Sequence, residues 1–278
     1  MNQNAVEYIK NHIKKFLPLE YQDAEVTVKE VVKHNDRVMT GLTILKDGNH
    51  TAPTIYLEPY WEEVEKGRLL SSVMKEIAQI QQEGDIEESI DLSAMKDYEN
   101  VKPMLSIRMC DPEKNTAYLK DKPYTAYGEL AALYRIQVLK EGELNGSIVI
   151  TNDIMRSWGI TKGQLHEDAV QAEKEKNPAC LYRMDDILFS AQTPNLLKED
   201  AALQMGDLPI FVLTNQDKSD GSGVMVQDGI LEKVGELLGT DYYMLPSSIH
   251  EVLILPDNGN MDIKELESIR LVPRISTS

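Results

Sequence analysis

Residues 209–255, PIFVLTNQDKSDGSGVMVQDGILEKVGELLGTDYYMLPSSIHEVLIL, decide the fold class. Two apolar runs in this stretch, Pro209 to Leu213 and Gly223 to Val226, lie on either side of a polar turn and predict a first pair of strands. A second pair is predicted at Tyr242 to Leu245 and at Glu251 to Leu255. Each pair is joined by a short turn, which favours antiparallel pairing.

A helix is predicted between the two strand pairs, over Gly229 to Leu238. Asp228 is placed to cap its first turn, and Gly239 is a suitable residue for a left-handed end. A final helix is expected to begin at Asp262. The order strand, strand, helix, strand, strand, helix lacks the regular alternation of a doubly wound parallel sheet. It therefore predicts an α+β fold in which helices flank antiparallel sheets.

The amino-terminal part has the same character. Apolar residues recur at helical spacing from Val6 to Phe16, and Pro18 ends the predicted helix. Three strands follow as a meander, and the next predicted element is a long helix over Glu58 to Gln82. The three strands cover residues 26–32, 38–44 and 54–57.

The middle of the chain adds strands at residues 104–109, 130–139 and 147–150, and a helix that Thr161 caps. Two packed lobes account for this order. Residues 1–145 would hold a helix, the strand meander, the long helix and further strands, and residues 146–278 would form a second α+β lobe. Because no Pro- or Ser-rich linker marks the boundary, a single domain is an open alternative.

The charge of the chain is large and unevenly spread. Its 29 Lys and Arg face 46 Asp and Glu, which gives a formal net charge of −17. This excess argues against direct binding to nucleic acid or to anionic lipid. Residues 51–100 hold four basic and twelve acidic side chains. The densest group is a candidate acidic contact surface, formed by Glu83, Asp85, Glu87, Glu88 and Asp91.

The cysteines and the amino terminus indicate the compartment. Cys110 and Cys180 are too few for a disulfide framework and lack the paired spacing of a zinc site. Residues 1–17 contain no apolar stretch of the kind that a secretory signal needs, and no run approaches the length of a membrane span. We expect a cytoplasmic protein that does not associate with membranes.

One short segment invites a catalytic interpretation. Ser248, His250 and Glu251 lie within four positions of one another, and a hydrolase uses a hydroxyl, an imidazole and a carboxylate. Known triads assemble from distant segments, however, and neighbouring residues of a strand point to opposite faces. A polar turn that begins at Pro246 is the competing interpretation.

Other common sites are not indicated. The five histidines are dispersed without metal-binding spacing, and no glycine-rich nucleotide loop occurs, so we expect neither a metal nor a cofactor. The run Asp220-Gly221-Ser222-Gly223 leads into a predicted strand, whereas a nucleophile elbow leads into a helix. We interpret that run as a hairpin turn.

Several motifs together suggest a family. PIFVLTN at 209–215, GILEKV at 229–234, YYMLPSSIHEVLIL at 242–255 and LEPY at 57–60 resemble an uncharacterised family of gut Firmicutes, the domain of unknown function 5688. The resemblance covers nearly the full chain. It implies a bacterial protein and transfers no catalytic residue.

Three functional hypotheses follow. The first is a non-enzymatic protein that acts through contacts with an unidentified protein partner. The second is a hydrolase-type enzyme with a site near Ser248, His250 and Glu251. The third is an acidic DNA mimic, whose carboxylates occupy the basic groove of a DNA-binding protein.

Overall fold

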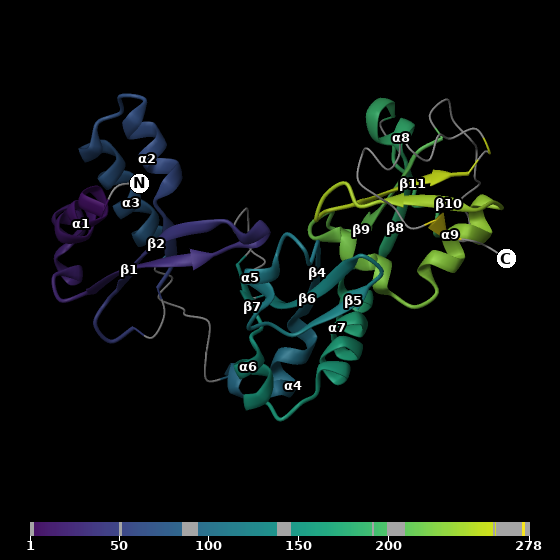
Figure 1. Cartoon of the computed structure of the whole chain (residues 1–278), viewed down its shortest axis with the longest axis horizontal. Coiled ribbons are helices and arrows are strands. Elements are labelled where there is room, and N and C mark those ends of the chain that lie inside the picture. Colours follow the sequence, from purple (N-terminus) through teal and green to yellow (C-terminus); the bar gives the residue numbers. More distant parts are fainter. Residues whose placement is uncertain are drawn as a thin grey trace. The chain divides into compact units, whose positions relative to one another are not determined.

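The computed structural model describes residues 3–49, 52–84, 94–137, 146–190, 192–198, 209–257, 259 and 274–275. Contacts within the chain divide it into two compact units, residues 1–92 and residues 93–278 (Figure 1). Each unit has its own hydrophobic core. In the described part of the chain, no helix combines the length and the apolar character needed to cross a membrane.

The first unit is a three-stranded antiparallel sheet with helices, and the predicted meander is confirmed. The strands pair in the order β1-β2-β3. Ile9 of the first helix and Ile77 of α3 pack with Leu42 and Ile44 of the central strand in one core. The elements are α1 (Gln3–His12), 3-10 turns at Ile13–Phe16 and Leu19–Tyr21, β1 (Glu25–Val32), a 3-10 turn at His34–Asp36, β2 (Val38–Leu45), β3 (Thr54–Tyr56), α2 (Glu58–Glu65) and α3 (Leu70–Gly84).

The long helix predicted over 58–82 is two helices. The cause is Gly67, whose φ of 99° is left-handed and cannot continue a right-handed helix. Arg68 follows the break and forms ion pairs with Glu63 of α2 and Glu76 of α3. These pairs join the two helices across the turn.

The second unit contains two antiparallel sheets. One has the order β4-β6-β5, with β7 also paired to β6, and the other has the order β12-β10-β11-β9-β8. The elements are α4 (Tyr98–Val101), β4 (Leu105–Cys110), α5 (Thr116–Leu119), β5 (Tyr124–Tyr127), β6 (Leu130–Gln137), β7 (Ser147–Val149), α6 (Asn152–Ser157), α7 (Lys162–Lys176), β8 (Ala179–Arg183), α8 (Met184–Phe189), β9 (Phe211–Asn215), α9 (Ile230–Leu238), β10 (Tyr242–Leu245), β11 (Val252–Pro256) and β12 (Arg274–Ile275), with 3-10 turns at Ala94–Lys96, Lys102–Met104 and η6 (Gly221–Val226).

The α+β class with antiparallel sheets is therefore confirmed. One apolar core joins the two sheets of the second unit, and α7 packs against β4 within it. Tyr134, Phe211 and Tyr242 are among the largest fully buried side chains of the chain. This core includes residues of β4, β6 and β9, and the site discussed below is formed by residues of β4 and β6 together with the loop that follows β9.

The boundary between the units differs from the predicted one. It lies at residues 92 and 93, whereas the predicted lobes meet at residues 145 and 146. The pairing of β7 with β6, in which Val149 faces Arg135, places both sides of the predicted boundary in one sheet. Strand pairing of this kind depends on contacts that no local pattern in the sequence records.

Two details of the carboxy-terminal motif also differ from the prediction. Residues 223–226 belong to the buried 3-10 turn η6 rather than to a strand. The N-cap of α9 is Gly229, with a φ of 76° and no side-chain cap, so Asp228 does not cap that helix. Gly239 ends α9 with a φ of 66°, as predicted. The helix predicted from Asp262 lies outside the described residues.

Candidate functional site

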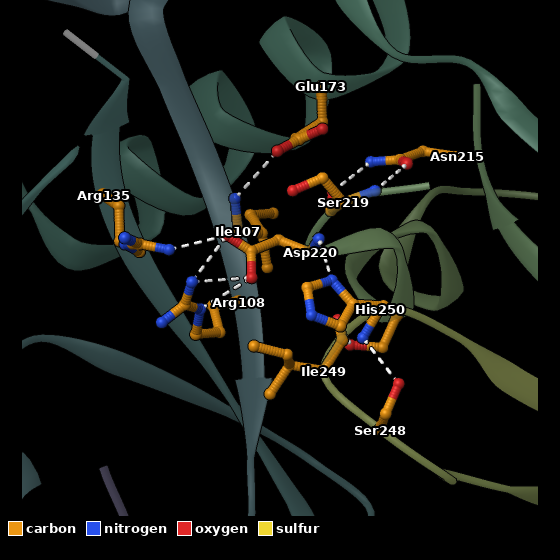
Figure 2. Close-up of polar contacts among 11 residues, drawn as sticks. Ile107, Arg108, Arg135, Glu173, Asn215, Ser219, Asp220, Ser248, Ile249 and His250 are labelled. Atoms are coloured by element: carbon orange, nitrogen blue, oxygen red, sulfur yellow. Dashed lines mark hydrogen bonds and ion pairs between the residues drawn. The ribbon is translucent and has the colours of Figure 1, made fainter. Parts of the chain in front are cut away.

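Polar contacts fix the loop between β9 and η6, residues 216–220. Asn215 fixes this loop, because its Nδ2 donates to the carbonyl oxygen of Ser219 (2.8 Å) and its Oδ1 accepts from the Ser219 amide (3.1 Å) (Figure 2). Asp220 ends the loop in a left-handed conformation, with a φ of 51°. Asp tolerates this conformation better than most residues because its short side chain bonds locally.

Asp220 joins the loop to the sheet that contains β4 and β6. Its carboxylate accepts two hydrogen bonds from Arg108, from Nε and from a terminal nitrogen (both 2.8 Å), and one from Arg135 (2.6 Å) (Figure 2). The side chains of Asp220 and Arg135 are only 12% and 13% exposed. Burial lowers the pKa of the Arg135 guanidinium, and the Asp220 carboxylate opposes this effect. Two guanidinium cations thus share one carboxylate in a largely buried setting, which leaves one formal positive charge.

Glu173 lies beside this group on α7. It is 6% exposed, and its Oε1 accepts a hydrogen bond from the backbone amide of Ile107 in β4 (3.1 Å). Burial raises the pKa of its carboxyl group to about 7. The charges of Asp217 and Asp220 act in the same direction, whereas the Ile107 amide and Lys176 oppose it. Glu173 is therefore a buried carboxyl group whose pKa lies close to neutral pH.

The turn between β10 and β11 contains the three predicted hydrolase residues, and their side chains bond to other groups rather than to one another in the contacts below. His250 Nδ1 accepts a hydrogen bond from the Asp220 amide (3.1 Å), and Ser248 Oγ accepts one from the His250 amide (3.0 Å) (Figure 2). Glu251 accepts a hydrogen bond from the hydroxyl of Ser247 (3.0 Å). Since Nδ1 accepts, the neutral ring carries its proton on Nε2. A triad imidazole instead accepts from the nucleophile and donates to the carboxylate.

Backbone contacts complete an interlocked unit that we call the clasp, formed by Thr214, Asp220, Gly221, Ser222, Ile249 and His250. Ser222 Oγ donates to the carbonyl oxygen of Ile249, and Thr214 Oγ1 donates to that of His250 (both 2.7 Å). A Cβ on Gly221 would lie 2.1 Å from Thr214 Oγ1 and 2.5 Å from the His250 carbonyl oxygen. The two segments approach so closely that only glycine fits.

Sequence reasoning missed Arg108, Arg135, Glu173 and Asp220 as a group. Arg108 and Asp220 are 112 positions apart in the chain, and Arg135 and Asp220 are 85 apart. A signal was present, because Arg108 interrupts the apolar run of β4 and Arg135 interrupts that of β6. A charged residue in an otherwise buried strand needs a partner.

The predicted acidic contact surface falls mainly outside the described residues. Glu83 is described near the end of α3, where its carboxylate accepts a hydrogen bond from Gln79 (2.7 Å). Asp85, Glu87, Glu88 and Asp91 lie outside the described residues. Their grouping as a contact surface stays a prediction.

The last turn of α8 exposes three consecutive apolar side chains, which we call the α8 end. Ile187, Leu188 and Phe189 are 40%, 56% and 81% exposed. The start of the same helix is anchored, because Arg183 donates two hydrogen bonds to Asp186 (2.8 and 2.7 Å). No motif in the sequence distinguishes this segment from a buried apolar run.

Groups for metal binding do not converge in the described residues, where no three His, Cys, Asp or Glu side chains could hold an ion. Cys110 and Cys180 are both buried and free. Burial raises the pKa of the Cys110 thiol to about 11. This thiol therefore stays protonated at neutral pH and is a poor nucleophile.

We compared the whole chain with known protein families, curated proteins and solved structures. A model of a family of unknown function, DUF5688, matches residues 3–275. The chain belongs to this family. The match confirms the resemblance inferred from the motifs at 57–60 and 209–255, and it spans both compact units. No curated protein and no solved structure matches the chain. The function of this DUF5688 protein must therefore be argued from its own residues.

Proposed function

We propose that this DUF5688 protein is non-enzymatic and acts through contacts with another protein. The α8 end is the observation that carries the proposal. Full burial of one Leu or Phe side chain is worth about 1.5–3 kcal/mol, and Ile187, Leu188 and Phe189 forgo much of this in the isolated chain. Neighbouring exposed apolar side chains of this kind mark interaction sites.

The charge of the chain indicates what kind of partner suits it. A net charge of −17 opposes the approach of a second copy and attracts a basic protein. We therefore infer a partner with a basic surface and an apolar recess for the α8 end. An interface of this type gains its energy from the apolar anchor and its association rate from the charges.

The clasp supports a structural role for the residues that resemble a hydrolase site. The Asp220 carboxylate is engaged by two arginines, and His250 Nδ1 is engaged by the Asp220 amide. These contacts hold the β9–η6 loop and the β10–β11 turn against each other. Holding this loop and this turn together accounts for the polar residues, and it does not need them to catalyse a reaction.

The alternative hypotheses lead to different results. A hydrolase centred on Ser248, His250 and Glu251 would hydrolyse an activated ester such as p-nitrophenyl acetate, and the His250→Ala change would abolish that activity. A DNA mimic would compete with DNA for a basic protein, and changing Glu87 and Glu88 to Gln would weaken that competition. A partner that binds the α8 end is expected to be insensitive to both changes.

Quantitative affinity capture tests the proposal. Wild-type protein, Phe189→Glu and the control Leu69→Glu are each immobilised and exposed to one bacterial extract, and the captured basic proteins are compared. Leu69 is 71% exposed and lies in the first unit. We expect Phe189→Glu to reduce capture of a specific basic protein about 30-fold or more, as for an anchor residue worth about 2 kcal/mol. Equal capture by Phe189→Glu and by wild type would contradict the proposal.

A further inference from the structure

A shallow hollow of about 540 Å³ lies in the second unit, next to α4, α6 and the start of α7. These helices gather at one end of that unit (Figure 1). The hollow is lined by Lys96, Asp97, Tyr98, Glu99, Ser157, Trp158, Ile160 and Gln164. It combines two aromatic rings with charged side chains and is separate from the clasp residues.

The two aromatic rings of the hollow are held in place. Their centroids are 5.4 Å apart, and the rings are inclined by 43°. The indole Nε1–H of Trp158 donates to the carbonyl oxygen of Met95 (2.8 Å), and the hydroxyl of Tyr98 donates to Asp168 (2.7 Å). Asp168 is itself paired with Lys102 (2.8 Å). Both rings therefore have little freedom to lose when a ligand binds, which favours affinity.

Two carboxylates adjoin the rings. Asp97 is fixed as the N-cap of α4, where its Oδ1 accepts from the Glu99 amide (3.1 Å), and Glu99 is exposed. Lys96 also lines the hollow, so the three formal charges leave one net negative charge. An indole face attracts a cation, and a carboxylate accepts the parallel N–H groups of a guanidinium. This combination suits a planar cation better than a compact ammonium.

We propose that this hollow binds the guanidinium group of an arginine side chain presented by the protein partner. The proposal rests on the proposed function for the source of the arginine. The guanidinium stacks on Trp158 and pairs with Glu99. A basic partner that attaches through the α8 end would thus have a second, polar point of contact in the same unit of this chain.

The chain offers a direct probe, because it contains only two tryptophans. Trp61 lies in the first unit, so the full-length Trp61→Phe variant leaves Trp158 as the sole fluorescent indole. This variant is titrated with the capped tripeptides Gly-Arg-Gly, Gly-Lys-Gly and Gly-Glu-Gly. We expect a saturable change in Trp158 emission with the arginine peptide, with a Kd on the order of 1 mM. The lysine peptide should bind several-fold more weakly, and the glutamate peptide should produce no change.

A matched pair of variants tests the role of the carboxylate. In the Trp61→Phe background, Glu99→Gln should lower the affinity for the arginine peptide about 5- to 10-fold, as expected for the loss of a charged hydrogen bond. Glu236→Gln removes the same charge from an exposed position on α9 that does not line the hollow, and should leave binding unchanged. Equal affinities of the two variants would overturn the proposal, as would a response to the glutamate peptide or no response to the arginine peptide.

Two further arms separate the possible explanations. Free arginine has an α-ammonium and a carboxylate that an arginine within a protein lacks, so a hollow that fits the arginine of a protein partner should bind it no more tightly than the capped peptide. Tighter binding of free arginine would overturn the assignment to a protein partner. Phe189→Glu should leave the peptide titration unchanged, because Phe189 does not line the hollow. If the arginine peptide does not change Trp158 emission but capture of a basic protein still depends on Phe189, the arginine site alone is refuted. If the arginine peptide binds but capture does not depend on Phe189, the proposed function alone is refuted.

Discussion

The clasp and the α8 end are two regions of the second unit that differ in which side chains they bury. The clasp buries polar residues, and the α8 end exposes apolar ones. The clasp takes polar and charged residues, which normally face water, and draws them into contacts between the β9–η6 loop, the β10–β11 turn and the other sheet. The α8 end takes Ile187, Leu188 and Phe189, which normally form a core, and exposes them. Both placements depart from the usual distribution of side chains, so each requires a reason.

The reasons differ. In the clasp, the Asp220 carboxylate accepts hydrogen bonds from two arginines and the Ser222 hydroxyl donates to a backbone carbonyl oxygen, and these bonds fix one geometry between the two sheets. At the α8 end the described residues leave Phe189 largely exposed to water, so we infer that a protein partner buries it. Stability and binding should therefore respond to different mutations.

The largest effect is expected from Gly221→Ala. A Cβ at this position meets the Thr214 hydroxyl and the His250 carbonyl oxygen at distances that no structure tolerates, so the clasp must open. We expect a loss of about 3 kcal/mol in the free energy of unfolding, at the upper end of the usual cost of overpacking, measured by urea denaturation. The control is Gly163→Ala in α7, where the nearest atom is 3.9 Å away. That change should stabilise by about 0.5 kcal/mol, and equal effects of the two would show that the clasp is loose.

A smaller loss is expected from Asp220→Asn. Asn tolerates the left-handed backbone, so the change removes the charge without straining the loop. Arg108 and Arg135 then lose their carboxylate in a largely buried setting, at a cost of about 2–3 kcal/mol. Asp153→Asn, in an exposed pair with Arg156, should change the free energy of unfolding by less than about 0.5 kcal/mol.

Glu173→Gln should alter the pH dependence of stability. The pKa of Glu173 is about 7 in the folded protein against an ordinary value of 4.5. Between these pH values the folded protein keeps a proton that the unfolded chain has lost, so stability falls as pH rises through this range. The full difference corresponds to about 3 kcal/mol.

The measurement is urea denaturation of wild type and Glu173→Gln from pH 5 to pH 8. Gln retains an oxygen that can accept from the Ile107 amide. The variant should therefore gain stability relative to wild type as pH rises, with the gain levelling off above pH 7. A difference between the two proteins that does not change with pH would refute the buried, proton-exchanging role of Glu173.

The smallest effect on stability is expected at the α8 end. Phe189→Ser removes a side chain that is 81% exposed and should change the free energy of unfolding by less than about 0.5 kcal/mol. Phe211→Ala, at a position that is 1% exposed, should cost about 3–5 kcal/mol in the same assay. A large loss on changing Phe189 would mean that this ring packs within the chain.

The sequence predicted the elements whose signal is local. The alternation of β1 and β2, the Thr161 cap of α7 and the glycine after α9 were each read from a few adjacent residues, and the α+β class followed from their order. Elements whose state depends on distant contacts were not predicted. Residues 223–226 are apolar enough for a strand, but η6 is buried between β9 and β4 and forms a tight turn there.

The candidate site was predictable only in part, for the same reason. Ser248 and His250 attracted attention because they are close in sequence, yet their contacts serve the turn that contains them. Arg108, Arg135 and Asp220 come from three distant segments, and no local pattern brings them together. The α8 end is a short apolar run of the kind that usually forms part of a hydrophobic core. Only the exposed fractions of its side chains in the folded protein distinguish it from a buried segment.

The most direct test of the contrast applies two assays to two variants. Urea denaturation and quantitative capture of a basic partner are measured for Asp220→Asn and for Phe189→Glu, both against wild type. We expect Asp220→Asn to lose stability and to keep the partner under conditions where it remains folded. Phe189→Glu should keep its stability and lose the partner about 30-fold or more. Retention of the partner by a folded Phe189→Glu, together with its loss in a folded Asp220→Asn, would contradict the account.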